Sequence, residues 1–184
     1  MKKYLYIILA VVIVIGLYTV VTYNSLVNLN ITADTQWKQV ETQYQRRFDL
    51  IPNLVESVKG AMKQEQAVFN AIAEARTRYS GASTANDKAL AAGQVESALG
   101  RLLVVMENYP TLKSSEAVQS LMTQLEGTEN RVSVERMRFN ESIKSYNLKV
   151  IKFPSSMVAS IFGFGEREYF NAVSGAENAP AVSF

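Results

Sequence analysis

The chain has 184 residues, enough for one domain and an appendage, and 48% of them are hydrophobic. Lys2 and Lys3 account for the formal net charge of +2, because the other basic residues equal the 17 acidic ones in number. No run of lysine and arginine with interleaved aromatic residues occurs, so no nucleic-acid partner is predicted. Histidine and cysteine are absent, which excludes disulfides, thiolate nucleophiles and imidazole or thiolate metal ligands.

The first predicted element is a membrane-spanning helix over residues 4–23. This stretch carries no charge, and twenty helical residues span roughly 30 Å, about the thickness of the hydrocarbon core of a bilayer. Tyrosines lie near both of its ends, where amphipathic rings prefer to sit. Residues 20–23 offer no small-residue cleavage site, and a buried core helix is not usually apolar on every face. We therefore expect a single-pass anchor in the lipid bilayer, preceded by a basic N-terminus at residues 1–3.

The charges around the anchor predict its orientation. Lys2 and Lys3 precede it, and the next charged residue is Asp34. Because basic residues are retained on the cytoplasmic side, we expect the N-terminus inside and the rest of the chain outside the cytoplasm. The expected location is the cytoplasmic (inner) membrane.

A long helix is expected from Leu26 to Tyr79. Apolar residues recur at alternating spacings of three and four over this stretch, as in coiled coils and helical bundles. Pro52 removes one helical hydrogen bond, so either the helix is kinked or a new helix begins there, capped by Asp49. The unbroken register favours a continuous, kinked helix.

Two further long helices follow. Residues 80–84 form a small-residue turn that can cap a helix from Ala85 to about Asn108. A third helix runs from Glu116 to about Lys152, and Pro154 ends it. A short helix, Met157 to Phe162, is expected before Gly163, and residues 164–184 read as an irregular tail that can fold back.

These elements predict an all-α protein. The membrane helix precedes an elongated antiparallel bundle of three long helices over residues 24–153. The short helix and the aromatic and alanine-rich tail fill residues 154–184. Strand-like runs bounded by turn signals do not occur.

Charged residues occupy apolar seam positions at Arg47, Glu129 and Arg136, and Glu65 is a fourth near a helix end. One interpretation is an ion pair that sets helix register, and the other is a ligand or partner site. We expect Arg47 to face Glu129. The candidate polar cluster comprises Arg46, Arg47, Asp49, Asn53, Glu126, Glu129, Asn130, Arg131 and Arg136.

The C-terminal aromatic residues form a second candidate site. They either provide a docking surface for a partner or cap the open end of the bundle. The residues concerned are Ile161, Phe162, Phe164, Tyr169 and Phe170.

Several ordered motifs make the chain resemble the LemA family of bacterial membrane proteins. The resemblance implies an N-terminally anchored helical bundle with no established enzymatic activity, in a family that includes paralogues associated with magnetosome membranes. The motifs are residues 23–27 (YNSLV), 46–55 (RRFDLIPNLV), 107–113 (ENYPTLK), 125–131 (LEGTENR), 153–155 (FPS), 162–164 (FGF) and 179–184 (APAVSF).

The function predicted from these features is structural. There is no Ser-x-x-Lys motif and no glycine-rich phosphate loop, so neither an enzyme nor a cofactor is expected. The leading hypothesis is a membrane-anchored scaffold that associates with itself or with other membrane proteins. The alternative is a sensory or ligand-binding module that uses the polar cluster. A remote third is a hydrolase that relies on carboxylates alone.

Overall fold

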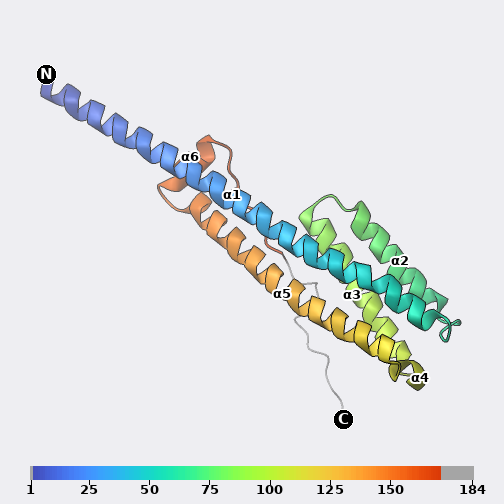
Figure 1. Ribbon diagram of the computed structural model, residues 1–184. Helices are drawn as coiled ribbons and strands as arrows, with labels where there is room; N and C mark the ends of the chain where they lie inside the picture. The colour runs from blue at the N-terminus through green and yellow to red at the C-terminus, as the bar shows by residue number, and fades with distance from the viewer. Residues whose placement is uncertain (1, 171–184) are drawn as a thin grey trace, which may run out of the picture. The chain divides into compact units, whose positions relative to one another are not determined.

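The computed structural model describes residues 2–170, and this part of the chain contains six helices and no strand (Figure 1). The all-α fold class is therefore confirmed. The predicted tail beyond residue 170, including the motif at residues 179–184, lies outside the described residues. The helices are α1 (Lys2–Lys59), α2 (Gln66–Gly81), α3 (Ala85–Met106), α4 (Pro110–Lys113), α5 (Glu116–Ile151) and α6 (Ser155–Ile161).

The described residues form two compact units. The first contains residues 2–38 and 137–169, and the second contains residues 39–136 and Phe170. Helices α1 and α5 each contribute to both units.

Helix α1 passes through Pro52 without a break, as the continuous register predicted. The expectation that it continues to Tyr79 is wrong, because α1 ends at Lys59 and the chain turns over residues 60–65 into α2. Gly60 is a weak helix former, and Met62 is fully buried within the turn. The hydrophobic register cannot reveal such a reversal, because a helix that folds back buries the same stripe of residues.

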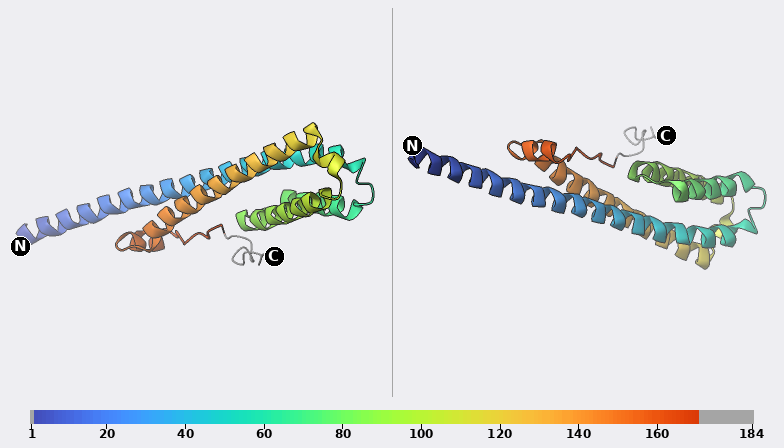
Figure 2. Two further views of the ribbon diagram at one scale, coloured as in Figure 1. Left: turned by 90° about the horizontal axis from the view of Figure 1, so that it is seen from below. Right: turned by 90° about the horizontal axis from the view of Figure 1, so that it is seen from above.

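Helices α2 and α3 are neighbours in the second unit (Figure 2). Thr84 caps α3, as its position predicted: its Oγ1 accepts a hydrogen bond of 3.1 Å from the Asp87 backbone N–H. The same hydroxyl donates to the Asp87 carboxylate at 2.7 Å. Helix α3 ends at Met106, and the sequence around Pro110 forms the short helix α4 that was not predicted.

In the first unit, α5 runs antiparallel to α1. The rings of Trp37 and Phe139 lie 5.3 Å apart, and Leu26, farther back along α1, joins a core with Tyr146 and Val150, farther forward along α5. Helix α6 adds Val158 and Ala159 to that core, and it begins at Ser155, two residues before the predicted start.

Gly163 ends α6, as predicted, with a φ of +75°. The Gly163 N–H donates to Ser160 at 3.4 Å and the Phe164 N–H donates to Ala159 at 2.9 Å. This is a Schellman motif, which favours glycine at the left-handed position. It reverses the chain so that Phe164 packs against the first unit's core.

Two helices among the described residues are long and apolar enough to cross a membrane, α1 and α3. The apolar window of α1 is almost entirely uncovered, whereas nearly half of the α3 window is buried within the protein. Helix α3 therefore has the character of a core helix, and the N-terminal part of α1 is compatible with membrane association.

Candidate functional site

The inward-facing charges of the second unit are held in pairs between helices. Arg47 of α1 is buried, and Glu129 of α5 forms an ion pair with it, the arrangement that the seam pattern predicted. Burial is the main cause that lowers the pKa of Arg47. The Glu129 side chain keeps 39% of its surface exposed, so the pair is buried on its arginine side and reaches water on its carboxylate side.

Arg136 of α5 forms a second set of contacts in the same unit. Its Nε donates to the Tyr44 hydroxyl at 2.9 Å, and its terminal nitrogen donates to the Glu96 carboxylate at 2.5 Å. The guanidinium also lies 5.3 Å and 4.7 Å from the ring centroids of Tyr44 and Phe170, respectively. Arg136, on α5, thus connects that helix to α1 and α3, and it also contacts Phe170.

The same environment shifts the pKa values of this set. Burial raises the pKa of Tyr44 to about 12, because the phenolate is disfavoured away from water, and Arg136 offsets only part of this effect. Burial opposes the charge of Arg136, but Tyr44 and Glu96 together raise its pKa above the usual value. The phenol is therefore neutral and the guanidinium charged throughout the neutral pH range.

A third pair joins α3 to α1. Lys88 contacts the Glu41 carboxylate, and both side chains are largely buried. Nearby, the Tyr79 ring lies 4.6 Å from Phe48 and 5.5 Å from Tyr44. Burial and the charge of Glu41 raise the pKa of Tyr79.

The remaining members of the predicted polar cluster do not join the inward charges. Asp49 accepts a hydrogen bond of 2.7 Å from Gln45, one turn away on α1. A surface groove of about 560 Å³ is lined in part by Arg46, Asp49 and Arg131. All six of these remaining cluster members are exposed: Arg46, Asp49, Asn53, Glu126, Asn130 and Arg131.

Sequence reasoning missed four partners of these contacts. Tyr44 reads as an ordinary apolar seam residue, and Glu41, Lys88 and Glu96 lie outside the seam pattern. One signal was available: Glu41, Tyr44 and Arg47 recur every three residues, a spacing that places their polar ends on adjoining faces of one helix.

The predicted aromatic docking surface is divided between the units. Phe162 and Phe164 lie beside Tyr23, with ring centroids 4.9 Å and 5.7 Å away, respectively. Ile161 and Tyr169 are exposed in the same unit, whereas Phe170 packs on Arg136 in the other.

A polar clamp that the sequence did not indicate holds the segment after α6 in place. The buried Asn147 side chain donates to the Arg167 carbonyl at 2.8 Å and accepts from the Arg167 N–H at 2.9 Å. The Arg167 guanidinium reaches α1, where it contacts Asn30 at 2.8 Å and Asp34 at 2.7 Å. The segment is thus fixed to both long helices of the first unit.

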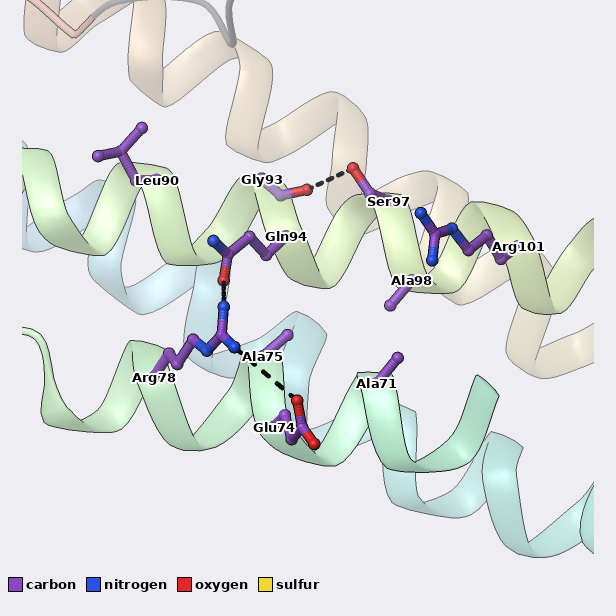
Figure 3. A pocket seen from close by; sticks show the side chains of 10 residues that line it. All are labelled: Ala71, Glu74, Ala75, Arg78, Leu90, Gly93, Gln94, Ser97, Ala98 and Arg101. Carbon is purple, nitrogen blue, oxygen red and sulfur yellow. Dashed lines mark hydrogen bonds and ion pairs between the residues drawn. The ribbon is translucent and has the colours of Figure 1, made fainter. Parts of the chain in front are cut away.

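A groove of about 490 Å³ lies between α2 and α3 (Figure 3). Arg78 crosses it, donating to Gln94 at 3.1 Å and approaching Glu74 at 3.8 Å. Arg78 and Glu74 are both well exposed, and exposed pairs of this kind contribute little to stability. Within residues 2–170, no three acidic side chains gather where they could hold a metal ion.

The sequence of this chain is similar to those of known proteins. The profile of the LemA family matches residues 36–184. Two similar proteins are the magnetosome proteins MamQ 2 of Paramagnetospirillum magneticum, 29% identical over 80% of this chain, and MamQ of Magnetospirillum gryphiswaldense, 29% identical over 81%. The chain spans 64% of the length of each of these relatives.

Proposed function

This chain belongs to the LemA family, and from that premise we propose that it is a membrane-anchored helical scaffold or interaction protein of the bacterial envelope, without catalytic activity of its own. In this proposal residues 4–23 span the cytoplasmic membrane. The N-terminus lies inside, and the chain from residue 24 onward lies outside the cytoplasm.

One observation carries the proposal: the apolar N-terminal part of α1 is exposed on every face. All residues from Tyr4 to Tyr18 are exposed, including eleven large hydrophobic ones from Leu5 to Leu17. Burying this surface in lipid is favourable by about 25 cal/mol for each Å² removed from water. The other described residues leave this stretch uncovered, so a bilayer is the environment that would bury its apolar side chains.

The inward charges of the second unit support a structural role. Arg47, Lys88 and Arg136 are each paired with a carboxylate from another helix. Paired side chains of this kind fix the alignment of helices. The burial of Arg47 also counts against the alternative of a ligand-binding sensor, which needs its guanidinium to be accessible.

The relatives support a place at a membrane. Their names assign those proteins to magnetosomes, and we carry over to this chain only the membrane association. Self-association and the choice of other membrane proteins as partners are part of the proposal and rest on the accessible surface of the two units.

The test is the mass of the full-length protein in nanodiscs, measured by light scattering beside a version that starts at Asn24. If both are oligomeric, the helical units carry the assembly surface and the scaffold is supported. If only the anchored form associates, assembly resides in the membrane segment. A full-length protein that is monomeric, or that is released from membranes by alkaline carbonate, contradicts a self-assembling anchored scaffold.

A further inference from the structure

The apolar surface around α6 is a feature that the scaffold proposal does not use. Met157 and Ile161 lie one turn apart on α6, on the side away from Val158 and Ala159, which are buried in the core. Phe153, in the turn before α6, and Phe162, just after it, extend the surface. The exposed fractions of Phe153, Met157, Ile161 and Phe162 are 81%, 59%, 74% and 49%. Side chains of this size gathered at one place mark an interaction surface.

The position of α6 along α1 identifies what covers this surface. The Phe162 ring contacts Tyr23 with a centroid distance of 4.9 Å, and Tyr23 is the last residue of the apolar run. Thr22, one residue earlier, is 1% exposed although its neighbours in the run face outward. Because residues 4–23 have about the length of the hydrocarbon core, a segment that packs at Tyr23 lies at the membrane surface.

The charges of the segment point to the same environment. Between Glu141 and Glu166 the chain contains no acidic residue, and its three charged residues are Lys144, Lys149 and Lys152. Lys152 is exposed next to Phe153. Exposed apolar side chains flanked by lysines are typical of segments that lie in the interface of an anionic bilayer.

We propose that the α6 region, residues 152–162, is a second membrane-contact element that lies in the headgroup layer of the bilayer spanned by the anchor. Met157, Ile161 and Phe162 enter the boundary of the acyl chains, and Lys149 and Lys152 lie near the lipid phosphates. The occupant is the bilayer because the apolar surface continues, through Phe162 and Tyr23, into the anchor itself. This inference rests on the proposed function, since it requires residues 4–23 to span the membrane.

The absence of cysteine from the chain allows a direct test. Single-cysteine variants of the full-length protein, M157C, M137C and V14C, are labelled with the fluorophore NBD in vesicles of phosphatidylcholine and phosphatidylglycerol. Met137 is the matched control, because it is also an exposed methionine of the first unit, 63% against 59% for Met157. Quenching by lipids that carry a doxyl group near the headgroup reports contact with the bilayer surface, and a deep doxyl group reports contact with its centre.

The expected result is a blue-shifted emission at Met157→Cys that is lost when the shallow doxyl lipid is present, with no quenching at Met137→Cys. If NBD at Met157→Cys emits at the same wavelength as NBD at Met137→Cys, the Met157 probe is in water and the inference is wrong. A blue-shifted Met157 probe that doxyl lipid does not quench is covered by another protein or a second copy, which also overturns it.

The Val14→Cys probe separates the two proposals. If the deep doxyl lipid quenches the Val14 probe but the Met157 probe is not quenched, the proposed α6 contact is wrong and the proposed anchor is supported. If the Val14 probe is not quenched, the anchor itself fails, and with it the proposed function.

Discussion

At the scale of single residues, the second unit depends on ionisable groups that have been taken out of water. Arg47 is buried, and its partner Glu129 is only partly so. Removing one partner of a buried pair leaves the other charge unsatisfied, and the cost depends on how easily water reaches that charge. The two halves of this pair are therefore not equivalent.

We expect Glu129→Gln to lower the free energy of unfolding by about 2–3 kcal/mol, because it leaves the buried Arg47 without an opposite charge. Arg47→Met should cost about 1 kcal/mol or less, since Glu129 can be hydrated through its exposed side. Urea unfolding in detergent micelles, with the double variant to complete the cycle, measures both values and their coupling. Equal costs for the two single variants would contradict the asymmetry.

The buried phenols predict loss of stability at high pH. The pKa of Tyr44 is about 12 in the folded protein, against about 10 in the unfolded chain. Between these values the folded state holds a proton that the unfolded state has lost, so stability is intact below about pH 10 and falls as pH rises further. For Tyr44 alone the loss amounts to about 2–3 kcal/mol by the folded pKa.

Absorbance at the phenolate band measures this effect during an alkaline titration. Tyr44 and Tyr79 should ionise together with the loss of helical circular dichroism. A Tyr44 that titrates while the helices remain intact and at the ordinary pKa would disprove the assignment. Tyr44→Phe identifies which part of the signal belongs to this residue.

At the scale of elements, the sequence predicted helix ends better than helix neighbours. Proline, glycine and capping hydroxyls act through local backbone geometry, so Thr84, Pro154 and Gly163 mark their boundaries correctly. The turn at residues 60–65 was missed, because Gly60 is its only breaker and the apolar register continues on both sides. The contacts of Tyr44 and Glu96 with Arg136 depend on which helices meet, information that periodicity does not contain.

The cap of α3 gives a prediction at this scale. Thr84→Ala removes the hydroxyl that accepts from the Asp87 N–H, and it should lower stability by about 1 kcal/mol. Thr77→Ala is the matched control: its hydroxyl bonds back to the Ala73 carbonyl within α2, on an exposed face. Such back-bonding does not stabilise a helix, so this change should be neutral or slightly stabilising. Thermal unfolding followed by circular dichroism compares the two variants.

At the scale of the whole molecule, α1 and α5 run without interruption through both units. A continuous helix transmits loss of order from one part to the next more readily than a loop does. Trp37, the single tryptophan of the chain, packs on Phe139 in the first unit.

We therefore expect Glu129→Gln, a change in the second unit, to shift the unfolding midpoint of Trp37 fluorescence together with that of circular dichroism. A Trp37 transition that stays in place while the helical signal moves would show that the units unfold independently. Leu90→Ala serves as the control, because this exposed residue of α3 should move neither transition by more than about 0.5 kcal/mol.

The first unit is assembled from two segments that lie far apart in the sequence, residues 2–38 and 137–169, and this has a consequence for biosynthesis. Arg167 bonds to Asn30, 137 residues earlier, and translation at about 5–20 residues per second separates their synthesis by roughly ten seconds. In the proposed membrane-anchored protein, residues 4–23 would therefore meet the membrane before the segment that contacts Tyr23, Asn30 and Asp34 has been made. Helices α2 and α3, by contrast, pack on each other and are close in the sequence, so both are synthesised before Arg167. If residues 4–23 span the membrane as proposed, a messenger truncated after α5 would produce an inserted protein without this segment, and we expect that protein to be degraded faster than the full-length one.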